Sequence, residues 1–190
     1  MKRGLSPKTE YAVMEATREV LGQRGLSGLS LDRVAERTEV TEDVYDYYDS
    51  PVELAVAFVE YERDRFDEFL MVTADEPDLR LRALLDVTVD LVDIEDDDLV
   101  PAYLEMYARA PEEERLREAL LEFDAEILDA LAETIRDGIE DGTFDDVDPE
   151  AAATMIFVTH MGTFLRKSVD ADTAEIRDSL DEFVLSTFRT

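Results

Sequence analysis

Apolar residues recur every three to four positions along most of the chain, which is the period of an α-helix with one buried face. The first such stripe contains Ala12, Val13, Ala16, Val20 and Leu21. Similar stripes follow at residues 31–38, 41–49, 51–72, 78–94, 99–109, 111–140, 149–168 and 173–188. No segment alternates apolar and polar residues as a half-buried strand does. The pattern therefore predicts an all-α protein of about nine helices.

Capping residues and prolines mark where these helices begin, and Gly25 marks the end of the first. The predicted starts are Ser6 or Pro7, Ser30, Thr41, Ser50, Pro111 and Asp148. In the third helix, Val44 and Tyr48 face the core, whereas Tyr45 and Asp46 face away. Connections of two to five residues join the first three helices. We therefore predict a compact three-helix head at residues 1–50 and a larger helical domain at residues 51–190.

Residues 11–54 combine several short motifs in a fixed order. These are Glu15-Ala16, Arg24-Gly25, Ser30, Val34-Ala35, Val40-Thr41, Tyr45, Tyr47-Tyr48, Ser50 and Leu54. The combination resembles the N-terminal helix-turn-helix domain of TetR/AcrR-type transcriptional regulators. Residues 137–165, with a glycine turn, Asp-Pro-Glu and an apolar helix, resemble a late segment of the same family. The resemblance implies that the helix beginning near Thr41 enters the major groove of DNA.

Ser30, Thr41, Tyr45 and Tyr47 match positions that contact DNA in this family. The candidate DNA-binding residues are Lys8, Ser30, Arg33, Thr41, Glu42, Tyr45 and Tyr47. Two positions depart from the family pattern: Pro51 stands where a phosphate-binding lysine is usual, and the segment from Val40 to Tyr45 is one residue shorter.

The net charge of −30 is extreme for 190 residues, with 25 Asp and 24 Glu against 16 Arg and 3 Lys. At molar salt the Debye length falls to ~3 Å, which screens repulsion between surface carboxylates. We interpret the composition as adaptation of a halophilic protein to a salty cytoplasm, with high solubility alone as the alternative. Residues 1–40 carry seven bases and six acids, a net charge of +1. A neutral segment on so acidic a chain favours an anionic partner there.

The predicted DNA-reading helix is itself acidic, because Glu42, Asp43, Asp46 and Asp49 occur without a base. Carboxylates repel phosphate, but they accept hydrogen bonds from cytosine amino groups in the major groove or bind cations that bridge to phosphate. With few bases to displace counterions, affinity for DNA is expected to fall only shallowly with salt. The alternative is an acidic dimeric sensor or interaction protein that keeps the fold and has lost DNA binding.

The resemblance also implies an effector cavity among the middle helices and a homodimer formed by the last two. The candidate pocket residues are Phe66, Phe69, Tyr103, Met106, Tyr107, Phe123, Ile127, Phe157 and Met161, with core packing as the alternative for each. The candidate dimer residues are Ile156, Thr159, His160, Thr163, Phe183 and Val184. The function these features predict is a ligand-responsive regulator, a repressor released by a small apolar or amphipathic effector.

Other chemistry has little support in the sequence. There is no cysteine, and His160 is the sole histidine, more typical of a packed residue than of a metal ligand. Asp137, Asp141, Gly142 and Asp148 align with a calcium loop, but Ile139 occupies a ligand position. No apolar run reaches the ~18 residues of a membrane span, and no secretion signal or catalytic set is evident. We predict a cytoplasmic protein without cofactor, metal or enzymatic activity.

Overall fold

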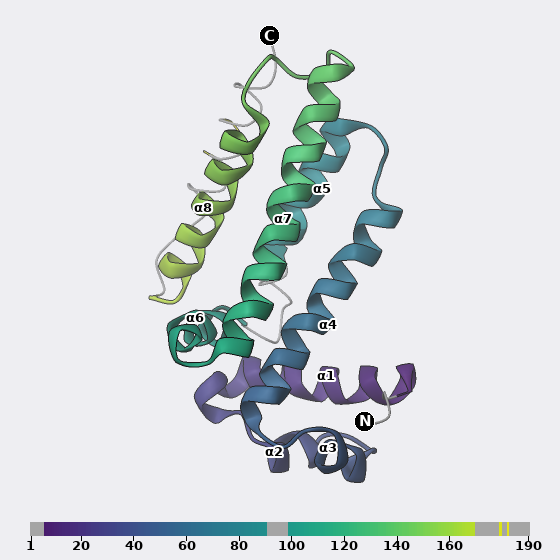
Figure 1. Ribbon diagram of the computed structural model, residues 1–190, viewed down its shortest axis with the longest axis vertical. Helices are drawn as coiled ribbons and strands as arrows, with labels where there is room; N and C mark the ends of the chain where they lie inside the picture. Colours follow the sequence, from purple (N-terminus) through teal and green to yellow (C-terminus); the bar gives the residue numbers. More distant parts are fainter. Residues whose placement is uncertain (1–5, 91–98, 170–178, 180–181, 183–190) are drawn as a thin grey trace. The chain divides into compact units, whose positions relative to one another are not determined.

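The computed structural model describes residues 6–90, 99–169, 179 and 182, without the side chains of residues 41–43 and 87–90. These residues form eight α-helices and two short 3₁₀-helices, with no strand among them (Figure 1). The elements are α1 (Pro7–Arg24), η1 (Leu26–Gly28), α2 (Leu31–Ala35), α3 (Thr41–Tyr47), α4 (Pro51–Val72), α5 (Pro77–Asp90), α6 (Val100–Arg109), η2 (Ala110–Glu112), α7 (Glu114–Glu140) and α8 (Pro149–Lys167). The all-α prediction is confirmed. The predicted ninth helix, residues 173–188, lies outside the described residues.

Four predicted helix caps are confirmed. The side chains of Ser6, Ser30, Ser50 and Asp148 each accept a hydrogen bond from the backbone N–H three residues later, at 3.2, 3.3, 3.2 and 3.0 Å. Each bond satisfies one of the N–H groups that the first turn of a helix leaves without an intrahelical partner. Local sequence therefore sets the starts of α1, α2, α4 and α8.

Two predicted starts are wrong. Val40 is the N-cap of α3 and makes no side-chain cap, because a valine has no acceptor, so Thr41 is already the first helical residue. Pro111 lies in η2, and the extended backbone of Glu113 (φ −127°, ψ 91°) separates it from α7. The second helix also ends at Ala35, three residues before the prediction.

The chain divides into two compact units. The first comprises residues 1–65 and 92–123 and holds α1, α2, α3 and α6 with the beginnings of α4 and α7. In it α2 contacts both α1 and α3. Its interior contains Val13, Met14, Val20, Leu21, Val34, Val44, Leu54, Phe58, Met106 and Leu116. The head thus packs with parts of α4 and α6, and the predicted functional division at residue 50 stays a prediction.

The second unit comprises residues 66–91 and 124–190, with α5, α8 and the later parts of α4 and α7. Arg80 of α5 pairs with Asp137 of α7, and Arg136 Nη2 of α7 lies 2.6 Å from Glu150 Oε1 of α8.

The predicted apolar stripe of α7 is confirmed, because Leu116, Leu120, Phe123, Ile127, Leu131 and Ile135 are all buried. Among the described residues, no helix combines the length and apolarity needed to cross a membrane.

Candidate DNA-binding head

The helix-turn-helix frame of α2 and α3 is held by a small apolar core. Val34, Ala35 and Val44 are buried, as predicted. Tyr48, which follows α3, is also buried. Burial raises the pKa of Tyr48 to about 12, and the nearby charges of Glu10 and Glu60 act in the same direction. The tyrosine is therefore a neutral core residue, in agreement with the role that the sequence predicted.

The opposite face of α3 presents polar groups. Tyr45 is 48% exposed, and Asp46 is exposed beside it. The Tyr45 hydroxyl donates a hydrogen bond to Asp32 Oδ1 of α2 at 2.8 Å. This bond is the main reason that the pKa of Tyr45 is raised, with smaller contributions from burial and from the carboxylate charges of Asp32 and Glu36. Both helices of the motif thus contribute to one polar patch that sequence reasoning did not anticipate.

The remaining candidates are distributed over α1, α2 and α3. Thr41 and Glu42 occupy the first turn of α3, and Tyr47 is half-buried in its last turn. Ser30 is the N-cap of α2, where its hydroxyl accepts from the Arg33 N–H. The structure therefore brings Ser30, Thr41, Glu42, Tyr45 and Tyr47 onto two adjacent helices, whereas Lys8 lies on α1.

Two arginines of the head are held by bonds within the head. Arg33 Nη1 donates to the carbonyl oxygen of Gly28. Arg37 donates to the Arg33 carbonyl and to Gln23 Oε1, both at 3.1 Å, and its Nε lies 3.8 Å from Glu19. These guanidinium groups brace α1 and α2, so a phosphate contact by either would compete with the existing bonds.

The exposed bases of the described head are fewer than its composition indicates. Arg18 is buried, and Arg33 and Arg37 are partly covered. Within residues 6–50, the bases in the exposed class are Lys8 and Arg24, which lie at opposite ends of α1. The positive charge that residues 6–50 offer to an anion is therefore small.

A buried ion pair that the sequence reasoning missed lies in the same unit. Arg18 of α1 and Glu62 of α4 pair through Arg18 Nη2 and Glu62 Oε1, with side chains 6% and 1% exposed. The Arg18 guanidinium also lies 5.5 Å from the centre of the Phe58 ring, and Arg65 Nη1 approaches Glu62 Oε1 at 3.6 Å. Burial lowers the pKa of Arg18, but the charge and hydrogen bond of Glu62 outweigh it, so the pKa is raised and Arg18 stays charged.

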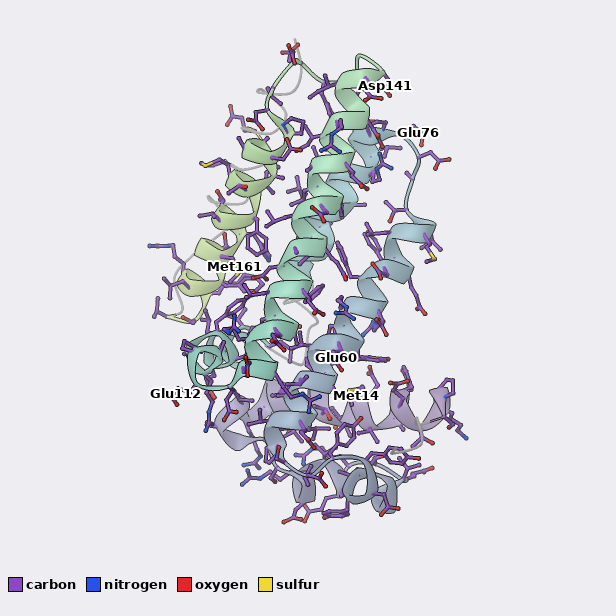
Figure 2. The ribbon with its side chains drawn as sticks, in the orientation of Figure 1. Met14, Glu60, Glu76, Glu112, Asp141 and Met161 are labelled. Carbon is purple, nitrogen blue, oxygen red and sulfur yellow. The ribbon has the colours of Figure 1, made fainter. Side chains whose placement is uncertain are left out.

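Helical spacing alone carried a signal for this pair. Arg18 follows the buried Met14 by four residues, and Glu62 follows the buried Phe58 by four. Residues four apart share one face of a helix, so both charges fall on apolar stripes. Met14, on α1, is labelled in Figure 2.

The corner between α1 and α2 is held by a carboxylate from α6. Glu105 Oε2 accepts a hydrogen bond from the Ser27 backbone N–H at 2.7 Å. Gly25 adopts φ +65°, and a Cβ atom there would lie 2.5 Å from Glu105 Oε1. The glycine is thus required by its positive φ, and a Cβ atom there would also displace the Glu105 carboxylate.

The predicted effector residues are divided between the two units. Tyr103, Met106, Tyr107 and Phe123 belong to the first, and Phe66, Phe69, Ile127, Phe157 and Met161 to the second. Tyr103, Met106, Phe123, Phe66 and Ile127 are buried. Burial raises the pKa of Tyr103, as does the charge of Glu62. Burial suits core packing as well as a pocket lining, so the effector pocket stays a prediction.

The predicted dimer residues on α8 are largely covered by the chain itself. Ile156, His160 and Thr163 are buried, and Thr159 is half-buried, whereas Phe183 and Val184 lie outside the described residues. The opposite face of α8 exposes Met155 (58%), Val158 (58%) and Leu165 (62%). This exposed apolar face is available to a second molecule, and the predicted dimer interface stays a prediction.

The acidic positions considered for calcium have separate roles. Asp137 pairs with Arg80, Asp141 Oδ1 accepts from the Thr143 N–H at 2.8 Å, and Asp148 caps α8. The bonds from Thr143 lower the pKa of Asp141, which lies at the end of α7 (Figure 2). Among the described residues, no group of three or more acidic or histidine side chains is arranged to hold a metal ion.

Comparison with solved structures identifies known proteins that share this fold. Across 97% of this chain and 100% of the other, the fold matches a TetR transcription regulator from Haloarcula marismortui ATCC 43049, with TM-score 0.83 and 28% identity. It also matches a transcriptional regulator from Saccharomonospora viridis in complex with choline, with TM-score 0.77, 16% identity, and 96% and 98% of the two chains covered. A TetR-family regulator from Rhodococcus sp. matches with TM-score 0.73, 24% identity, and 95% and 98% coverage.

A search of curated protein sequences found no match. In contrast, residues 77–189, more than half of the chain, match the family model of the C-terminal domain of BetI-type transcriptional repressors. The helices α5, α6, α7 and α8 all lie within the matched residues. The chain therefore belongs to the TetR family of transcriptional regulators, with a C-terminal domain of the BetI type.

Proposed function

We propose that the protein is a homodimeric repressor that binds an operator through α3 and is released by a small-molecule effector. The observation that carries the proposal is the intact frame of α2 and α3, with Val44 and Tyr48 buried and Tyr45 exposed. In helix-turn-helix proteins the second helix of the motif lies in the major groove. A regulator of this kind would act in the cytoplasm, without cofactor or catalysis.

Neutral groups would make much of the contact with phosphate. Hydroxyl groups, backbone N–H groups and helix N-termini all bind phosphate without a full positive charge. Lys8 is exposed on α1, whereas Arg33 and Arg37 already bond within the head. Binding of this type releases few counterions, so it would tolerate the salty cytoplasm that the acidic composition suggests.

The exposed face of α8 supports the dimer. Met155, Val158, Gly162 and Leu165 are spaced by three, four and three residues, which is the seam of a helix that packs against a parallel or antiparallel partner. We propose that this seam pairs with its copy. Two heads in such a dimer would meet DNA one helical turn apart, ~34–36 Å.

The effector is proposed to be apolar or amphipathic. The aromatic side chains of α4, α6 and α7 suit an apolar ligand, and aromatic faces also attract quaternary ammonium groups. The Saccharomonospora viridis regulator was solved with choline, so choline is a suitable first probe. A fatty acid or its thioester would represent the second ligand class.

A second candidate function is a dimeric sensor that no longer binds DNA. It is favoured by the four acidic residues of the segment from Glu42 to Asp49 and by the internal bonds of Arg33 and Arg37. A mobility-shift assay with the DNA upstream of its own gene separates the two functions. It should be run both at low salt and at about 2–3 M KCl, where repulsion between carboxylates and phosphate is screened.

A retarded complex that choline or another effector releases supports the repressor. A complete lack of retardation at every salt concentration, with and without effector, would leave the sensor as the function.

A further inference from the structure

Tyr45 and Asp32 form one unit on the outer surface of the helix-turn-helix. Tyr45 lies on α3 with 48% of its surface exposed, and its hydroxyl donates to Asp32 Oδ1 of α2 at 2.8 Å. Asp32 is also in the exposed class. The bond spans the two helices of the motif, so the position of the phenol oxygen is defined relative to both.

The direction of this hydrogen bond decides what the pair can bind. A phenol has a single O–H donor, and an ionised carboxylate only accepts. The one proton of the Tyr45 hydroxyl is therefore committed to Asp32. The groups that remain for an outside partner are the lone pairs of the phenol oxygen and of the Asp32 carboxylate. A phosphate oxygen, which also only accepts, gains no hydrogen bond from them and is repelled by the carboxylate.

In the major groove, the groups that donate hydrogen bonds are N4 of cytosine and N6 of adenine, whereas guanine O6 and thymine O4 accept. We infer that Tyr45, fixed by Asp32, acts as a specificity-determining residue that reads the amino group of a cytosine or an adenine. This inference rests on the proposed DNA binding by α3. It assigns Tyr45 to base reading. A tyrosine hydroxyl without a carboxylate partner could instead donate a hydrogen bond to a phosphate oxygen.

Selection from a random duplex DNA library tests the inference with the full-length protein. The wild type should enrich a half-site in which one position is cytosine or adenine. Tyr45→Phe should lose this preference by about tenfold, the range expected for one base contact, while the other positions keep theirs. Asp32→Asn adds an amide donor and should shift the same position towards guanine or thymine. Tyr11→Phe, which alters an exposed tyrosine of α1, should leave the selected site unchanged.

Modified bases give a second, direct readout. Removal of the amino group at the selected position, with 2-pyrimidinone for cytosine or unsubstituted purine for adenine, should weaken wild-type binding about tenfold and leave Tyr45→Phe binding unaffected. Circular dichroism of each variant confirms that it is folded.

The possible outcomes separate the inference from the proposed function. If the wild type selects a site and both variants select the same one, the hydrogen bond merely braces α2 against α3 and the inference is wrong. A wild type that enriches no sequence at any salt concentration would instead overturn the proposed DNA binding itself.

Discussion

Arg18 of α1 and Glu62 of α4 are paired inside the first unit, 44 residues apart in the chain. Loss of one partner leaves the other charge buried and uncompensated, at a cost of about 3–5 kcal/mol. Arg18→Met should therefore lower the free energy of unfolding by about 3 kcal/mol. The double variant Arg18→Met/Glu62→Leu should recover most of that loss, because apolar residues can replace a buried pair at little cost.

Urea unfolding at constant KCl measures both effects. Arg115→Met is the matched control, because Arg115 Nη1 lies 3.4 Å from Glu53 in an exposed pair and such pairs contribute at most about 1 kcal/mol. Equal losses for the single and the double variant would mean that the pair is not the source of the stability.

Two helical glycines are predicted to respond oppositely to alanine. A Cβ atom at Gly138 of α7 would lie 2.1 Å from the Phe144 ring, whereas one at Gly162 of α8 would meet no atom within 4 Å. Gly138→Ala should destabilise the fold by about 1–3 kcal/mol through overpacking. Gly162→Ala, made in the Leu165→Asp background that removes the proposed dimer contact, should stabilise the fold by up to about 1 kcal/mol, since alanine favours the helix. Thermal and urea unfolding measure the stability of the two variants. A change in the free energy of unfolding that has the same sign in both would contradict the packing of Phe144 on Gly138.

His160 should make the fold sensitive to mild acid. Burial, and to a lesser extent the charge of Lys167, lowers its pKa to about 4 from the usual 6.5. The folded state thus favours the neutral imidazole. The stability that this neutral form contributes is fully present at pH values above the pKa of His160 in the unfolded chain. Below that pH the unfolded chain takes up the proton first, so stability falls between about pH 6.5 and pH 4.

At about pH 5 this loss amounts to about 2 kcal/mol. His160→Gln removes the titrating group, so between about pH 7.5 and 5 the wild type should lose that much more stability than the variant. Parallel curves for the two proteins would show that the imidazole is protonated equally well in both states.

DNA binding should respond to the exposed lysine of α1 more than to the bonded arginines. Each phosphate contact by a base contributes about 0.9 to the slope of log affinity against log salt. Lys8→Gln should reduce that slope by about 0.9 per head. Arg37→Gln should leave it unchanged, because Arg37 bonds to the Arg33 carbonyl and to Gln23. The affinity for DNA, measured over a KCl series, gives this slope for each variant. A smaller slope for Arg37→Gln would show that this arginine leaves its partners within the head to bind phosphate.

The exposed seam of α8 should control oligomeric state. Leu165 is 62% exposed and Leu121 of α7 is 54% exposed, so aspartate at either position adds a charge without disturbing the core. Leu165→Asp should produce a monomer, since a carboxylate in an apolar interface is costly to desolvate, whereas Leu121→Asp should remain dimeric. Sedimentation or light scattering reads the mass directly. A wild type that is monomeric at every concentration would remove the proposed dimer altogether.

Local interactions are the part of the structure that the sequence predicted well. Helix starts at Ser6, Ser30, Ser50 and Asp148 depend on a side chain and an N–H three residues away, and the stripe of α7 depends on spacing within one helix. The start of α3 was mispredicted because a threonine is a good cap only when it precedes the helix, and the chain enters the helix one residue earlier.

The partners in long-range polar contacts could not be predicted from the sequence. Arg18 meets Glu62, Glu105 meets Ser27, and Asp32 meets Tyr45 across separations of 44, 78 and 13 residues. Which carboxylate approaches which donor depends on how helices cross, and neither composition nor periodicity contains that information. The same limit explains why Arg33 was expected to contact DNA, although its guanidinium is bonded to the Gly28 carbonyl within the head.

The hydrogen bond from the Ser27 N–H to Glu105 has a bearing on the order of folding. The corner between α1 and α2 is completed by a residue that is synthesised 78 residues after Ser27. A nascent or truncated chain that stops at residue 50 lacks Glu105, and it also lacks the carboxylate that compensates Arg18. The contacts of Ser27 and Arg18 are thus completed only when α4 and α6 have been made.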